Sequence, residues 1–228
     1  MRKNDVIYYN LYQALSEKAC SVCQCIDQAT NSFLDNLLYE FVNDYRTRDR
    51  LRETGGFCYD HSWALQRMGD PLGQSIIYAD LIDYILPRIE KGEVEKKKTL
   101  IGKTHKCLVC IQEHDTKKRY IRGLLASLND MDFRDKYRSS VGLCLPHYEM
   151  AFQQVTDGDV RAVLREVEID SLTKLIAELK EFIRKSDYRY AGEPPGEERD
   201  AWIRAIELWV GSFNTKKQQR TILKPKVT

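Results

Sequence analysis

Apolar residues recur every three or four positions through most of the chain, which is the spacing of amphipathic helices. Strictly alternating patterns, which would indicate strands, are almost absent. The predicted helices cover residues 4–18, 26–52, 58–68, a segment from Asp70 that contains Pro87, then 110–127, 130–138, 145–155, 159–185 and 197–213. The pattern therefore predicts an all-α fold.

Two short motifs each occur twice, at an almost constant offset of 86 or 87 positions. Cys20-Ser-Val-Cys23 matches Cys107-Leu-Val-Cys110, and Gly56-Phe-Cys58-Tyr-Asp-His61 matches Gly142-Leu-Cys144-Leu-Pro-His147. Apolar positions between the motifs agree as well: Phe33, Leu34, Leu37, Leu38 and Phe41 fall on Tyr120, Ile121, Leu124, Leu125 and Leu128. We interpret the chain as tandem duplicated helical modules, each built on a CxxC…GxCxxH pattern.

Cysteine pairs and Cys-x-x-His pairs at this spacing are typical of metal ligation. Two thiolates separated by two residues can reach one ion from a single turn, and a Cys with a His three residues later completes a tetrahedral Cys3His set. We expect each module to be clasped by one such site. The predicted ligand sets are Cys20, Cys23, Cys58 and His61 for the first module, and Cys107, Cys110, Cys144 and His147 for the second.

Zinc is the metal that this ligand set favours, at two ions per chain. An iron–sulfur cluster is the alternative, although it normally takes four cysteines. Disulfides need an oxidising compartment, for which the N-terminal segment gives no export signal, and seven cysteines leave one over. A redox CxxC lacks an adjacent βαβ pattern. Cys25 matches Gln112 in the second module and is interpreted as an extra thiol.

The predicted organisation has four parts. The first module spans 1–92 and the second 105–190, with residues 91–104 as the candidate linker. A Pro- and Gly-containing loop leads to a C-terminal amphipathic helix at 197–214, which carries Trp202 and Trp209. We expect this helix to pack on the bundle, with docking on a partner as the alternative. The basic tail, 215–228, is interpreted as a solubilising terminus.

Composition narrows the possible partners. The chain has 36 Lys and Arg against 34 Asp and Glu, and 43% of its residues are hydrophobic. This near-balance argues against a dedicated nucleic-acid binder, which usually carries a basic excess. The longest stretch without a charged residue, Val6–Ser16, is too short to span a bilayer. We expect a cytoplasmic protein with a protein partner of unknown identity.

These residues resemble a bacterial family of uncharacterised proteins that share duplicated CxxC…G[FL]CxxH modules. The resemblance covers about residues 5–185 and includes Gly69-Asp70-Pro71-Leu72-Gly73. It implies a cytosolic, helical, metal-binding protein and carries no assigned activity. Cys25 departs from the pattern, and the C-terminal helix lies outside it.

Three functional hypotheses follow from the sequence. The first is a binding or scaffold module with two structural zinc sites. The second is a thiol/zinc redox sensor in which Cys25 acts as a resolving thiol. The third is a metal-dependent hydrolase or transferase with an open coordination position. Four protein ligands per ion leave no such position, and HExxH, GxSxG and Gly-rich phosphate loops are not found in the sequence, so we expect no catalytic residues.

Overall fold

The computed structural model describes residues 5–92, 107–190 and 192–212. Over these residues the chain forms helices and loops and no strand, so the predicted all-α fold is confirmed. None of the helices among these residues combines the length and apolar character needed to cross a membrane. The chain divides into two compact units: unit 1 comprises 1–27 and 119–228, and unit 2 comprises 28–118.

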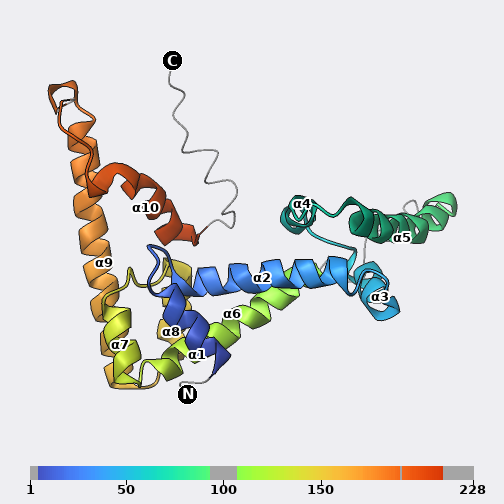
Figure 1. Cartoon of the computed structure of the whole chain (residues 1–228), viewed down its shortest axis with the longest axis horizontal. Helices are drawn as coiled ribbons and strands as arrows, with labels where there is room; N and C mark the ends of the chain where they lie inside the picture. Colours follow the sequence, from blue (N-terminus) through green and yellow to red (C-terminus); the bar gives the residue numbers. More distant parts are fainter. Residues whose placement is uncertain (1–4, 93–106, 191, 213–228) are drawn as a thin grey trace. The chain divides into compact units, whose positions relative to one another are not determined.

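The boundary between the units falls inside two long helices, α2 (Ser21–Tyr39) and α6 (Leu108–Ser127) (Figure 1). Each unit therefore contains the start of one of these helices and the end of the other. The division does not coincide with the motif copies along the sequence. Most of the candidate linker and all of the basic tail lie outside the described residues.

Unit 1 packs the start of α2 against the end of α6. Its other elements are α1 (Val6–Ala14), α7 (Met131–Arg138), α8 (Leu145–Gln154), α9 (Gly158–Lys185), the short 3-10 helices Tyr188–Tyr190 and Glu197–Asp200, and α10 (Ala201–Val210). Val22 and Ile26 share one apolar core with Ile121 and Leu124. The Tyr8 ring packs on Phe133, which attaches α1 to α7. The 28-residue helix α9 has α10 beside it (Figure 1).

Unit 2 follows the same plan with the roles of the long helices exchanged. The end of α2 and the start of α6 share a core through Leu34, Leu37 and Val109. Around them lie α3 (Tyr45–Thr54), α4 (Tyr59–Arg67) and α5 (Pro71–Glu90). Pro87 is accommodated inside α5, and Asp70 caps the start of that helix by accepting a hydrogen bond from the Gly73 amide.

Positions matched by the sequence offset are buried alike in the two units. The following pairs are all buried: Val22 with Val109, Leu34 with Ile121, Leu51 with Tyr137, Ile77 with Val163, and Leu81 with Val167. Equivalent helices also have equivalent caps. Asp44 precedes α3 and Asp130 precedes α7, and each carboxylate accepts a hydrogen bond from the backbone amide three residues later. The offset therefore relates the two cores as well as the two motifs.

One predicted helix is wrong in its extent. We expected a single helix over 26–52, but the structure has α2 ending at Tyr39 and α3 beginning at Tyr45. The apolar stripe continues across this break and conceals it. The break is set by Asp44, whose carboxylate accepts hydrogen bonds from the Thr47 amide and hydroxyl at 2.8 Å. Such capping satisfies amide groups that a continuous helix would have bonded internally.

Candidate metal centres

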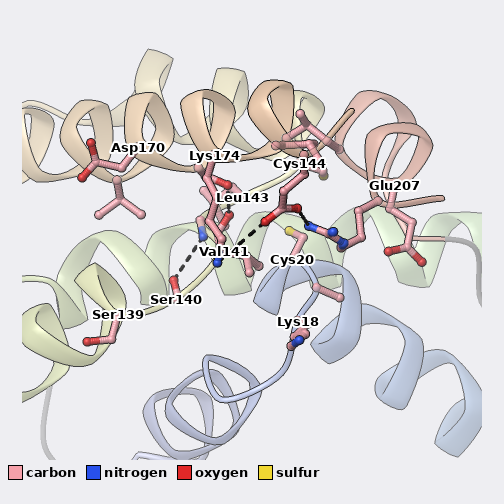
Figure 2. Close-up of a pocket in the computed structure, with 18 of the residues that line it drawn as sticks. Lys18, Cys20, Ser139, Ser140, Val141, Leu143, Cys144, Asp170, Lys174 and Glu207 are labelled. Carbon is pink, nitrogen blue, oxygen red and sulfur yellow. Dashed lines mark hydrogen bonds and ion pairs between the residues drawn. The ribbon is translucent and has the colours of Figure 1, made fainter. Parts of the chain in front are cut away.

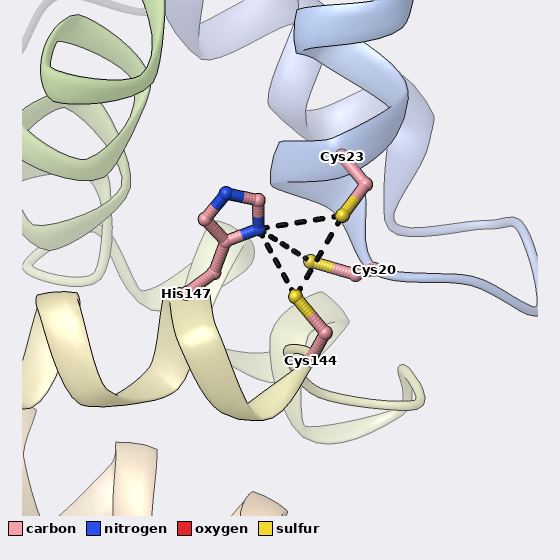
Figure 3. Close-up of side chains that lie close together, drawn as sticks. All are labelled: Cys20, Cys23, Cys144 and His147. Carbon is pink, nitrogen blue, oxygen red and sulfur yellow. Dashed lines mark hydrogen bonds between the residues drawn. The ribbon is translucent and has the colours of Figure 1, made fainter. Parts of the chain in front are cut away.

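Four ligand-type side chains of unit 1 converge on one point (Figure 3). Cys20 directly precedes α2 and Cys23 lies in its first turn, while Cys144 caps α8 and His147 follows in its first turn. The His147 Nδ1 atom lies 3.5 Å from the Cys20 sulfur, 3.3 Å from the Cys23 sulfur and 3.1 Å from the Cys144 sulfur. The Cys23 and Cys144 sulfurs are 3.7 Å apart. We call this group the His147 cluster.

Unit 2 contains a second group of the same composition, the His61 cluster. Cys107 precedes α6 and Cys110 lies in its first turn, while Cys58 caps α4 and His61 follows. The His61 Nδ1 atom lies 3.2 Å from the Cys58 sulfur, 3.5 Å from the Cys107 sulfur and 3.3 Å from the Cys110 sulfur. The Cys58 and Cys110 sulfurs are 3.7 Å apart.

The clusters correct the predicted pairing of the ligands. We expected each CxxC to join the CxxH of its own module, but Cys20 and Cys23 lie with Cys144 and His147, and Cys107 and Cys110 lie with Cys58 and His61. The physical reason is the length of α2. At about 1.5 Å per residue, its 19 residues carry the chain about 28 Å away from Cys20. Each CxxC therefore meets the CxxH that follows the other long helix.

The dimensions of both clusters fit a tetrahedral zinc ion. Bonds of about 2.3 Å to sulfur and about 2.0–2.1 Å to nitrogen give tetrahedral edges of about 3.8 Å between sulfurs and about 3.6 Å between sulfur and nitrogen. The sulfurs are 3.7 Å apart where they are closest, and the sulfur–nitrogen edges span 3.1–3.5 Å. A disulfide would bring two sulfurs to about 2.05 Å, and all seven cysteines are free.

Every cysteine of the two clusters lies at or next to the start of a helix. Cys58 and Cys144 occupy N-cap positions without a side-chain hydrogen bond of the usual capping kind. Each of these residues instead places its sulfur at the positive end of a helix. Backbone amides near Cys107 help to lower its pKa. Each cluster therefore brings together two helix N-termini.

Without a metal ion, the cysteines within each cluster differ in pKa. In the His147 cluster, hydrogen bonds from Cys144 and Cys20 lower the pKa of Cys23, whereas burial raises that of Cys20. In the His61 cluster, burial acts to raise the pKa of Cys107, but the His61 bond and nearby amides lower it to about 6. Because ligation needs all three thiolates, metal binding must release protons.

The surroundings of the two histidines differ. The His61 Nε2–H group donates a hydrogen bond to Glu113 Oε1 at 3.0 Å, and the Thr30 hydroxyl donates to the same oxygen at 3.0 Å. Burial acts to raise the pKa of Glu113, but the bond from His61 holds it below its usual value. The position matched to Glu113 in the other half of the sequence is Ile26, which is buried. The motif spacing alone carried no signal for this carboxylate.

A cavity of about 260 Å³ lies beside the His147 cluster, with Cys20 and Cys144 in its wall (Figure 2). Unit 2 contains a smaller cavity, about 180 Å³, at the equivalent place. The matched lining residues are Arg138, Gly142, Leu143 and Val167 in unit 1, and Arg52, Gly56, Phe57 and Leu81 in unit 2. The unit 1 cavity also has a charged wall in which Glu178 pairs with Lys174 and Arg204.

Cys25 belongs to neither cluster. It lies one turn into α2, is 2% exposed, and burial raises the pKa of its thiol to about 12. The expectation that Cys25 is an extra thiol agrees with this placement. A buried thiol with a raised pKa is a poor nucleophile.

The fold and its site define an all-α protein with two Cys3His-type clusters. The chain belongs to a family of unknown function (DUF6062), whose model matches residues 3–216. It is 28% identical over 204 residues to an uncharacterized 23.9 kDa protein in the xynA 3'region of Caldicellulosiruptor sp. (strain Rt8B.4). The matched stretch covers 89% of this chain and 100% of that protein. No solved structure matches. The expected membership of an uncharacterised family is thus confirmed.

Proposed function

We propose that this protein is a zinc-binding interaction module that holds two structural Cys3His zinc ions, ligated by Cys20, Cys23, Cys144 and His147 and by Cys58, His61, Cys107 and Cys110. The observation that carries the proposal is the pair of four-residue clusters, whose dimensions match a tetrahedral zinc ion. In this proposal the matched motifs, caps and cores descend from a duplication, and each unit is organised around one ion.

A structural role follows from the ligand count. Four protein ligands fill a tetrahedral zinc site, whereas a catalytic zinc ion keeps one position for water or substrate. When bound, the ion would supply cross-linking of two helix starts and neutralise the thiolates. A hydrolase would need one of these four ligands to leave. A sensor with Cys25 as the resolving thiol is disfavoured by the burial of that thiol.

The interaction role rests on α10. Its apolar face remains exposed, with Trp202, Ile206, Trp209 and Val210 between 45% and 71% accessible. The predicted packing of this helix on the bundle is seen on its other side, toward α8 and α9. Exposed aromatic stripes of this kind are typical of protein-binding surfaces, so we assign the partner side of the module to α10. Localisation in the cytoplasm, where thiols stay reduced, would keep both ligand sets available.

The test is native mass spectrometry of the freshly purified full chain, combined with X-ray absorption at the zinc edge. We expect two zinc ions per chain and an average first shell of three sulfurs and one nitrogen. A chain that carries no metal and binds none on addition of zinc would overturn the proposal. A first shell with an added light-atom ligand and fewer sulfurs would favour the hydrolase instead.

A further inference from the structure

We infer that the two sites are not equivalent: the His61 cluster is the one at which zinc exchanges with solution, and Glu113 is the positioning residue that sets its affinity. This inference rests on the proposed zinc binding and concerns how the two ions behave. Both clusters have the same ligand set and the same motif spacing, so any difference between them must come from what surrounds them.

The first difference is access. The four residues of the His147 cluster are all buried: Cys20 is 7% exposed, Cys23 6%, Cys144 2% and His147 6%. In the His61 cluster, Cys110 is exposed and Cys58 is partly exposed. A competing ligand replaces a protein ligand by approaching the metal–sulfur bond directly, and Cys110 offers that approach. Cys20 and Cys144 line the cavity of unit 1, but their small exposed fractions restrict the access of a competing ligand to their sulfurs.

The second difference is a helix end that lies against only one of the clusters. Gly211 ends α10, and a Cβ at this position would lie 3.3 Å from the Cys23 sulfur and 3.8 Å from the Cys144 sulfur. The φ of Gly211 is +93°, a conformation in which other residues are strained. A backbone segment with no side chain therefore lies beside the sulfurs of the His147 cluster. Among the described residues of unit 2, no helix corresponds to α10.

The third difference is the outer partner of the histidine. Glu113 receives hydrogen bonds from His61 and Thr30, which fixes the His61 ring with Nδ1 toward the three sulfurs. A carboxylate behind a ligating histidine raises the basicity of the ring, and loss of such a partner typically costs about 10- to 100-fold in metal affinity. The matched residue Ile26 has no polar side-chain atom, so it cannot accept a hydrogen bond from His147 or raise the basicity of its ring. The accessible site thus has its own means of retaining the ion.

The experiment follows the zinc-loaded full chain by native mass spectrometry during a challenge with EDTA and N-ethylmaleimide, with the modified cysteines mapped over time. We expect a species with one zinc ion to accumulate, labelled at Cys58, Cys107 and Cys110, while Cys20, Cys23 and Cys144 stay unmodified. Simultaneous loss of both ions, or first labelling in the His147 cluster, would overturn the inference. Failure to load any zinc would instead overturn the proposed function itself.

Variants separate the contributions. Glu113→Gln keeps an acceptor for His61 but removes the charge, and Glu113→Ala removes both, so we expect zinc affinity of the His61 cluster to fall about 10- to 100-fold in the alanine variant and less in the glutamine variant. Affinity of the His147 cluster is the internal reference and should not change. Glu90→Gln is the control for removing a carboxylate charge from unit 2, because Glu90 is exposed at the end of α5. Equal loss at both sites in the Glu113 variants would show a general folding role and contradict the assignment.

Gly211→Ala tests the effect of the end of α10 on the His147 cluster. The added methyl group and the positive φ should displace the end of α10 from the Cys23 sulfur. We expect the His147 cluster to be labelled and depleted several-fold faster in this variant, at an unchanged rate for the His61 cluster. An unchanged rate at the His147 cluster in a variant that remains folded would mean that Gly211 does not limit access.

Discussion

The sulfur of Cys23 lies 3.7 Å from that of Cys144, a residue 121 positions away in the sequence, whereas Cys58 lies in the other unit. Each Cys3His cluster thus joins the CxxC of one motif copy to the CxxH of the other. The long helices α2 and α6 make this exchange necessary, because each starts in one unit and ends in the other.

This pairing predicts the metal content of double variants. Cys20→Ser with Cys144→Ser damages only the His147 cluster, so we expect one zinc ion per chain by native mass spectrometry. Cys20→Ser with Cys58→Ser damages both clusters, so we expect no tightly bound ion. Pairing within each motif copy would give the reverse result, with one ion retained in the second variant.

Removal of metal should destabilise both units. Each metal-free cluster brings three thiols together at two helix starts, and an ion that neutralises them would contribute folding free energy directly. We expect a strong chelator to lower the midpoint of thermal unfolding by 10 °C or more, as an order-of-magnitude estimate from the size of metal-linked stabilisation. Circular dichroism and scanning calorimetry would measure it. The Cys25→Ala variant should respond to the chelator to the same extent.

Glu168 should make stability fall with rising pH. It is 3% exposed, its Oε2 accepts a hydrogen bond from the Leu143 amide at 3.4 Å, and its Oε1 has no hydrogen-bond partner among the described residues. Burial raises its pKa from 4.5 to about 7. Because the folded state favours the protonated form, the stabilisation that Glu168 gives the folded protein is complete below pH 4.5. This stabilisation is lost as the pH rises to about 7.

The Glu168→Gln variant tests this dependence. We expect wild-type protein to lose about 1–3 kcal/mol of unfolding free energy relative to the variant between pH 4.5 and 7, measured by urea denaturation of the zinc-loaded protein. Above pH 7.5 the difference in unfolding free energy between wild-type protein and the variant should stay constant. A difference that does not change with pH would show that Glu168 is ionised throughout.

A side chain at Gly56 or Gly142 should destabilise the protein. Both precede a Cys-x-x-His turn with a φ of +78° and +74°, and a Cβ would lie 3.1 Å from a Leu81 methyl group at Gly56 and 3.2 Å from Glu168 Oε2 at Gly142. We expect Gly56→Ala and Gly142→Ala each to cost about 1–3 kcal/mol, measured by denaturant titration. Gly158→Ala is the control, because nothing lies within 4 Å of a Cβ there.

The sequence allowed most of the fold and all members of the two clusters to be predicted. Helical periodicity found the apolar faces, and motif spacing singled out the eight Cys and His residues. Pairing was not predictable from spacing, since either combination gives a Cys3His set. It depends on helix length and direction, and the Asp44 break was concealed by an apolar stripe. Glu113 and Gly211 lie beside the clusters through tertiary contacts that the motif spacing does not indicate.

The exchanged pairing imposes an order of events during synthesis. When Cys58 and His61 leave the ribosome, the only CxxC available is the wrong one, because Cys107 and Cys110 have not yet been made. A zinc ion captured at that stage would join Cys20 and Cys23 to Cys58 and His61, and the native arrangement requires that this ion be released again. Closing contacts over more than a hundred residues is intrinsically slow. If zinc binds as proposed, capture at that stage would delay the native pairing of Cys58 and His61 until after Cys107 and Cys110 have been made.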